Sequence, residues 1–348
     1  MISFNNDYSE GAHPKVLELL LTSNLEQNAG YGEDVHSDRA KGYIKKHLGR
    51  EDVDIHFIPG GTQTNLLVIS SFLRPHQCVI AVDTGHINVH ETGAIEATGH
   101  KVLALEGVDG KLTTKAIRKA LEIHSDEHMV QPKMVYISNT TELGTVYTKA
   151  ELTAIHDLCK EKGLLLFLDG ARLASALTCK TNNLSLEDIA KLTDVFYIGG
   201  TKNGALLGEA LVICREDLKI DFRYLIKQRG ALMAKGFVIG IQFEALFMDD
   251  EREALYYQLG RHANAMAEMI ADTLHEIGYS FYAPVCSNQL FPILPDYLLE
   301  QLSEHFNFTV QAKVDATYSA VRFVTSWATT QENVAKLIQI LKSYTKIY

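Results

Sequence analysis

Two apolar segments of the chain each lead into a residue that can do chemistry. Leu164 to Leu168 (LLLFL) precedes Asp169, and Val195 to Ile198 (VFYI) is followed by two glycines, Thr201 and Lys202. Each segment has the composition of a buried strand, so the acid and the amine are expected at neighbouring strand ends. Pyridoxal phosphate needs such a pair, because a lysine bonds its aldehyde and a carboxylate keeps its ring nitrogen protonated. The sequence therefore predicts a site for this cofactor.

Asp169 has an alternative partner in Arg172, which completes the sequence Asp-Gly-Ala-Arg. Acids and bases at this spacing often pair, and a carboxylate at a buried strand end needs some cation, either a guanidinium or a protonated ring nitrogen. Lys202 has glycines on both sides, in Gly199-Gly200-Thr201-Lys202-Asn203-Gly204. A lysine that bends over a ring needs such flexible neighbours, whereas a surface lysine rarely does.

A glycine turn and a histidine are expected at the same end of the sheet. In Pro59-Gly60-Gly61-Thr62, Gly61 and Thr62 could hold a phosphate at a helix N-terminus, and a plain turn with Thr62 as N-cap is the alternative. The turn lacks the residues of a Walker loop or a Rossmann fingerprint. His86 could stack on an aromatic cofactor, or it could be an ordinary hydrogen-bonded loop histidine.

Other histidines and one arginine are further candidates. His86 and His90 are four residues apart, as are His124 and His128. Neither pair has the glutamate of HExxH or a third ligand, so no metal site is predicted. Arg322 lies within the apolar segment AVRFVT. It could snorkel at a sheet edge, or it could hold a substrate carboxylate from a second domain by two hydrogen bonds.

Strand and helix patterns alternate along the chain, which predicts an α/β fold with a largely parallel sheet. Helices are expected at 14–21, 37–48, 62–73, 89–98, 112–123, 149–162, 253–277, 295–306 and 331–344, and strands at 55–58, 78–82, 101–105, 134–138, 164–168, 195–198, 210–214, 289–294 and 320–325. The pattern changes near residue 245. We therefore predict a large domain over residues 1–245 and a smaller one over residues 246–348.

The composition is that of an ordinary globular protein, with 46% hydrophobic and 22% charged residues among 348. A formal net charge of −10 argues against a nucleic-acid or anionic-membrane partner. The start of the chain does not look like a signal peptide, and no window is apolar enough for a membrane span. The five cysteines are dispersed without a CxxC pair, which suggests reduced thiols and a cytoplasmic protein.

Taken together, these motifs resemble those of the low-specificity threonine aldolases, within the β-eliminating lyase group of fold-type I pyridoxal phosphate enzymes. The matching segments cover nearly the whole chain and are Asn5-Asn6-Asp7, Tyr31-Gly32-Glu33-Asp34, Pro59-Gly60-Gly61-Thr62, His86 to Glu91, Asp169-Gly-Ala-Arg172, Thr201-Lys202 and Val321 to Thr325. The resemblance implies the transferase-like fold of that group, with a large cofactor-binding domain and a small α+β domain at the C-terminus.

The resemblance also implies a role for each motif. Lys202 carries the cofactor, and the further cofactor contacts are Asp169 at the ring nitrogen, His86 on the ring face, Gly61 and Thr62 at the phosphate, and Thr201. Arg172 and Arg322 bind the substrate carboxylate, with Asn6 where the family usually has serine. The family works as a homotetramer, a dimer of dimers with shared sites. Arg229 and Lys235 occupy the segment that contacts a neighbouring subunit's phosphate.

The implied reaction is the retro-aldol cleavage of a β-hydroxy-α-amino acid, threonine or allo-threonine, to glycine and an aldehyde. The general base is open, because His86, His90, His128 and a water molecule are all candidates. His90 stands on the substrate side, where the family commonly has an aromatic residue. The alternatives are a β-eliminating amino acid lyase, a transaminase, and a protein that keeps this fold without catalysis.

Overall fold

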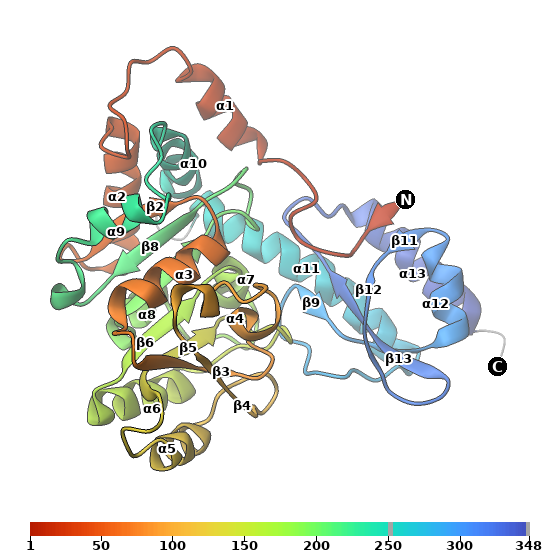
Figure 1. Cartoon of the computed structure of the whole chain (residues 1–348). Helices are drawn as coiled ribbons and strands as arrows, with labels where there is room; N and C mark the ends of the chain where they lie inside the picture. The colour runs from red at the N-terminus through yellow and green to blue at the C-terminus, as the bar shows by residue number, and fades with distance from the viewer. Residues whose placement is uncertain (250–252, 346–348) are drawn as a thin grey trace.

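The computed structural model describes residues 1–249 and 253–345. At its centre is a seven-stranded sheet in the order β2-β8-β7-β6-β5-β3-β4 (Figure 1). The strands are β2 (Asp54–Ile58), β3 (Gln77–Val82), β4 (Val102–Leu105), β5 (Gln131–Ser138), β6 (Leu165–Asp169), β7 (Val195–Gly199) and β8 (Glu209–Ile213). Strand β8 is antiparallel to β2 and β7, whereas the remaining pairs are parallel. The predicted α/β fold with a mostly parallel sheet is confirmed.

Successive strand residues point to opposite faces of this sheet, and each face has its own hydrophobic cluster. In β6, Leu166 and Leu168 belong to one cluster, and Leu165 and Phe167 belong to the other. Helices of the first cluster are α1 (Pro14–Thr22), α2 (Val35–Leu48), α5 (Thr114–Ile123), α6 (Lys149–Lys162), α7 (Leu173–Thr178), α8 (Leu186–Leu192), α10 (Phe237–Phe247) and the start of α11 (Leu255–Glu276). Helices of the second are α3 (Gly61–Phe72), α4 (His86–Val89) and α9 (Phe222–Gln228). By the same alternation, Asp169 points to the second face.

The C-terminal part has a smaller, four-stranded sheet with β13 at its centre. Its strands are β9 (Gln289–Leu290), β10 (Ile293–Pro295), β12 (Thr309–Lys313) and β13 (Tyr318–Val324). A third hydrophobic cluster forms between this sheet and α11 (Leu255–Glu276), α12 (Asp296–Ser303) and α13 (Gln331–Thr345). In Figure 1, α11 runs from beside the large sheet into this part. None of the described helices could span a membrane.

The first residues of the chain pack with the C-terminal part. Strand β1 (Ile2–Ser3) pairs with β11 (Phe306–Asn307), and Phe4 is buried in the third hydrophobic cluster. The chain then crosses to the large sheet, where α1 begins (Figure 1). A domain division at residue 246 stays a prediction, and residues 250–252 and 346–348 of the second domain lie outside the described part.

Two predicted elements are wrong. The helix expected at 89–98 is replaced by α4 and a 3₁₀ turn at Glu96–Thr98. Thr92 and Gly93, which lie between these two elements, have φ of 52° and 73°, and a helix cannot continue through such residues. The strand expected at 289–294 is divided into β9 and β10, which pair with different segments of β13.

Candidate active site

The candidate residues gather at one edge of the large sheet. The parallel strands β3, β5, β6 and β7 end there, β2 ends there as well, and the antiparallel β8 begins there. The loops that leave this edge carry the glycine turn after β2, His86 after β3, Asp169 at the end of β6 and Lys202 after β7. Ligands of α/β sheets bind in this position, beyond the carboxyl ends of the strands.

Asp169 is buried, and both of its oxygens are hydrogen bonded. Oδ1 accepts from the Tyr197 hydroxyl at 2.5 Å and the Ala171 backbone N–H at 3.0 Å, and Oδ2 accepts from the Tyr136 hydroxyl at 2.6 Å and the Asn65 amide at 3.1 Å. Burial alone would raise the pKa of Asp169, but the nearby His86 and the two tyrosine hydrogen bonds outweigh burial, so the pKa is lowered. The carboxylate is therefore ionised at neutral pH, as the partner of a protonated ring nitrogen must be.

Lys202 faces the same cavity with its amine uncommitted. Within the described chain this amine has no hydrogen bond or ion pair, and it lies 5.9 Å from the centre of the Tyr8 ring. Burial, and then the charge of Arg172, lowers the pKa of Lys202 and favours the neutral amine that attacks an aldehyde. The turn before it is fixed by Glu209, whose Oε1 accepts from the Thr201 hydroxyl at 2.8 Å.

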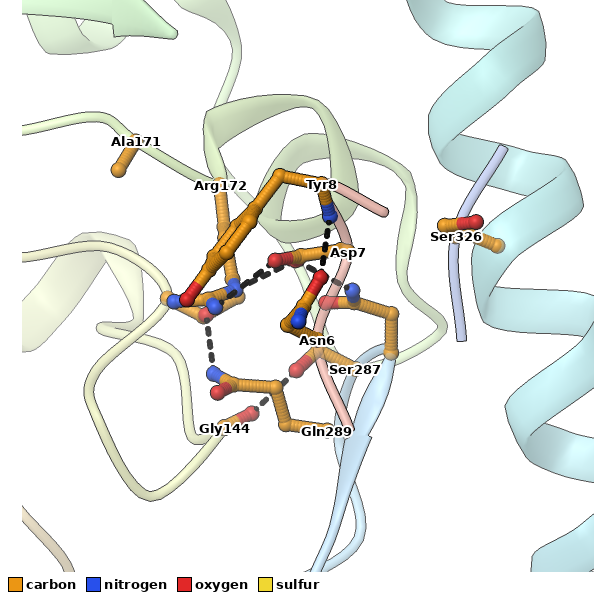
Figure 2. A network of polar contacts seen from close by, with 12 residues as sticks. Asn6, Asp7, Tyr8, Gly144, Ala171, Arg172, Ser287, Gln289 and Ser326 are labelled. Carbon is orange, nitrogen blue, oxygen red and sulfur yellow. Dashed lines mark hydrogen bonds and ion pairs between the residues drawn. The ribbon is translucent and has the colours of Figure 1, made fainter. Parts of the chain in front are cut away.

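Arg172 pairs with Asp7 rather than with Asp169, so the alternative ion pair is wrong. Its Nε and Nη2 donate to the two oxygens of Asp7 at 2.6 and 2.9 Å, and the Asn288 amide donates to Asp7 at 3.0 Å. Figure 2 shows Asp7 turned toward the guanidinium and the Tyr8 ring lying beside it. The N-terminal segment thus supplies two side chains to the site.

Arg322 projects from β13 toward the same region. It does not lie on an edge strand, because β13 pairs with β10 and β12 on its two sides. Its Nε is buried and has no hydrogen-bond partner within the described residues. Burial, and then repulsion from Arg172, lowers the pKa of Arg322 to about 10. Two guanidiniums that repel each other, one with an unused donor, form a binding site for an anion such as a carboxylate.

Two adjoining cavities connect these groups. The inner cavity, of about 340 Å³, is lined by residues that include Gly60, Gly61, Thr62, Asp169, Thr201 and Glu209. The outer cavity, of about 580 Å³, is lined by residues that include His90, Gln289, Gln311 and Arg322. Five residues border both cavities, namely Tyr8, His86, Glu142, Arg172 and Lys202. The inner cavity lies between the acid and the glycine turn, and the outer one faces the guanidiniums.

The inner cavity fits pyridoxal phosphate. Gly60 is the N-cap of α3, so the alternative with Thr62 as N-cap is wrong. A Cβ on Gly60 would meet no atom within 4 Å, and one on Gly61 would meet the Tyr197 hydroxyl at 3.2 Å. The turn therefore leaves space for a phosphate at the helix N-terminus. Asp169 and Lys202 supply the two groups that the ring and aldehyde of the cofactor require.

Four predicted site residues lie away from these cavities. The Asn6 Oδ1 accepts from the Tyr8 N–H and the Ser9 hydroxyl, each at 3.0 Å, and so caps a turn, while its role toward a substrate stays a prediction. His128 is exposed in the loop before β5, at the opposite edge of the sheet from the cavities, and its role as a base stays a prediction. Arg229 and Lys235 are exposed near the end of α9 and before α10. The described residues contain no cluster of His, Cys, Asp or Glu that could hold a metal ion.

Several site residues were not predicted from the sequence. Tyr136 and Tyr197 could have been found from the strand alternation. Each lies on a strand next to β6 and points to the same face of the sheet as Asp169. Glu142 follows β5, where loops at this edge begin. Asp7 lies in the matching segment Asn5-Asn6-Asp7, but its pairing with Arg172 left no signal, since the two are 165 residues apart in the chain.

The fold and the site define a pyridoxal phosphate enzyme of the fold-type I class. The chain belongs to the β-eliminating lyase family, which matches residues 11–296. The low-specificity L-threonine aldolase of Pseudomonas aeruginosa is 32% identical over 350 residues, which cover 97% of this chain and 96% of that protein. That of a Pseudomonas species is 32% identical over 340 residues, 96% and 95% of the two chains.

Solved structures agree with these relatives. The structure of a threonine aldolase from Leishmania major is 51% identical, with a TM-score of 0.96 over 99% of this chain and 100% of that one. An aspartate aminotransferase of Thermus thermophilus, 16% identical with a TM-score of 0.72 over 99% and 91% of the two chains, shares the fold. The predicted family, fold and cofactor are thereby confirmed.

Proposed function

We propose that this chain cleaves a β-hydroxy-α-amino acid, threonine or allo-threonine, to glycine and an aldehyde by a retro-aldol reaction. The names of the full-length relatives support this reaction. The observation that carries it is the position of Lys202 at the border of the two cavities. Asp169 lies on its cofactor side, and the guanidiniums of Arg172 and Arg322 lie on its substrate side.

The residues divide the work of the reaction between them. Arg172 and Arg322 hold the substrate carboxylate and so set the direction of the Cα–Cβ bond. Asp169 remains ionised and holds the proton on the ring nitrogen. When bound, pyridoxal phosphate would supply an acceptor for the electron pair of the broken Cα–Cβ bond. Gly61 and Thr62 are proposed to hold the phosphate, and His86 the face of the ring.

A homotetramer and a cytoplasmic location are parts of the same proposal. Arg229 and Lys235, both exposed in this protomer, would reach the phosphate in a neighbouring subunit of a dimer of dimers. All five cysteines are free and four are buried, which suits a reducing compartment. The net charge of −10 suits a small-molecule substrate better than a nucleic acid.

The test is to supply L-threonine, L-allo-threonine and phenylserine separately to the cofactor-loaded protein and to assay aldehyde and glycine. Both products are expected from at least one substrate, and Lys202→Ala should release neither. Ammonia with a 2-oxo acid would instead indicate elimination, and dependence on an added 2-oxo acid would indicate a transaminase. A cofactor-loaded protein that turns over no amino acid would contradict every catalytic assignment.

A further inference from the structure

Glu142 occupies an unusual position in the site. It follows β5 and borders both the inner and the outer cavity. Its Oε1 accepts from the Ser138 hydroxyl at 2.7 Å and from the His86 backbone N–H at 3.0 Å. Its Oε2 is buried and has no hydrogen-bond donor within the described part of the chain. A buried acceptor without a donor costs about 1–3 kcal/mol, so this position indicates a donor that arrives with a ligand.

The surroundings of Glu142 make its carboxylate a stronger base than an exposed one. Burial raises the pKa of Glu142, the Ser138 hydrogen bond opposes that effect, and the negative charge of Asp169 raises the pKa further. A carboxylate with a raised pKa removes protons more effectively than one with an ordinary pKa. Arg172 and Arg322 lie close enough that the charge of Glu142 raises the pKa of each of them.

In the proposed substrate complex, the β-carbon of the substrate is expected close to Glu142. The substrate carboxylate lies at Arg172 and Arg322 in the outer cavity, and its amino group lies at Lys202, on the border of the two cavities. The β-hydroxyl is therefore expected near that border, where the other side chains are Tyr8, His86 and Glu142. Glu142 is the carboxylate of this set.

The two nearby histidines are less suited to take this proton. The Nδ1 atom of His86 is already engaged with Glu91 at 2.8 Å. His90 borders the outer cavity and not the inner one. Burial lowers the pKa of His90, and His86, Arg322 and other nearby cations lower it further. A proton on His90 would add a positive charge beside two guanidiniums. A proton on Glu142 removes a negative charge from a buried position, which is the cheaper change.

We propose that Glu142 is the general base that removes the β-hydroxyl proton of the substrate; this inference rests on the retro-aldol function proposed above. The hydroxyl proton passes to the Glu142 carboxylate, and the electron pair of the O–H bond forms the second carbon–oxygen bond of the aldehyde. The Cα–Cβ bond breaks, and the cofactor, when bound, would supply the acceptor for its electron pair. Cα then takes a proton to give glycine, and Glu142 returns its proton to solvent.

The test compares Glu142→Gln with the wild type in two measurements. The amide keeps the shape and the Oε1 acceptor of Glu142 but cannot take a proton. Cleavage of the best substrate, measured as kcat/KM for aldehyde release, is expected to fall about 100- to 10,000-fold. Binding of the cofactor and of glycine needs no β-hydroxyl base. Their dissociation constants, measured by visible absorbance, should therefore change less than about three-fold.

The pH profile and a matched variant separate catalysis from packing. The wild-type kcat/KM should rise with pH as Glu142 ionises, and the Gln variant should lose that limb. Glu127→Gln makes the same change at an exposed glutamate that precedes β5 and lines neither cavity, so it should keep both the rate and the limb. Should Glu142→Gln fail to fold, added formate is expected to restore cleavage to Glu142→Ala, because a small carboxylate can replace the missing base but not a packing contact.

Three results would overturn the proposal for Glu142. One is a cleavage rate in the Gln variant close to that of the wild type. Another is a parallel loss of cleavage and glycine binding without rescue by formate, since that pattern shows a packing role. A third is a rising pH limb that survives in the Gln variant. A wild type that releases no aldehyde from any β-hydroxy amino acid would instead refute the retro-aldol function itself.

Discussion

The ion pair between Asp7 and Arg172 is expected to contribute strongly to the stability of the protein. Asp7 exposes 1% of its surface, and its carboxylate accepts two hydrogen bonds from the guanidinium and one from Asn288. The change Asp7→Asn preserves the shape of the side chain but leaves the buried charge of Arg172 without its partner. Removal of one partner from a buried pair lowers the free energy of unfolding by about 3–5 kcal/mol.

Asp52 provides a matched control for this measurement. Its carboxylate also accepts two hydrogen bonds from one arginine, Arg50, at 2.9 and 2.6 Å, but 67% of its side chain is exposed. Because solvent screens an exposed pair, Asp52→Asn should lower the free energy of unfolding by about 0–1 kcal/mol. Both pairs have two guanidinium–carboxylate hydrogen bonds, so the variants differ in burial and in the additional Asn288 hydrogen bond of Asp7.

The assay is urea denaturation of the cofactor-free protein and both variants, with the slope of the transition fitted for each. The pKa of Asp7 is lowered in the folded protein, because Arg172 and Lys202 outweigh burial. Its contribution to stability is thus present above its unfolded pKa of about 3.8 and is lost as the pH falls through the folded value. Equal losses in Asp7→Asn and Asp52→Asn at neutral pH would refute the reasoning from burial.

Two further predictions concern Glu209 and Gly60, which line the inner cavity. Burial raises the pKa of Glu209 from 4.5 to about 8, so its stabilising contribution is complete below about pH 4.5 and is lost as the pH rises toward 8, by at most about 5 kcal/mol. Denaturation midpoints across this range should fall for the wild type relative to Glu209→Gln, and a constant difference would show that the carboxyl does not titrate there. Gly60→Ala places a methyl group in open space, so the cofactor-free protein should unfold within about 1 kcal/mol of the wild type, while the cofactor dissociation constant rises about ten-fold or more. An unchanged dissociation constant would place the phosphate elsewhere.

Much of the fold was predictable from the sequence because buried strands leave a continuous apolar signal. The segments before Asp169 and Lys202 were placed correctly as neighbouring parallel strands. The helix expected at 89–98 was wrong because Thr92 and Gly93 have positive φ, which an apolar pattern does not reveal. Hydrophobic periodicity shows where a helix or strand can form, but it does not show where the chain turns.

The site was predictable where a motif and a strand end coincide. Lys202, Asp169 and His86 follow that rule, and each borders a cavity in the structure. The partner of Arg172 could not be predicted, since it depends on where the first residues of the chain are placed by contacts with the last ones. The roles of individual residues toward cofactor and substrate stay predictions until the experiments above are done.

The position of the N-terminal segment has a consequence for the order in which the molecule can be completed. Asp7 is synthesised 281 residues before its amide partner Asn288. Strand β1 likewise pairs with β11, at Phe306 and Asn307. During synthesis the large sheet can therefore form while its substrate cavity is still unfinished. Arg172 acquires its counter-charge in place only after the C-terminal strands have emerged from the ribosome.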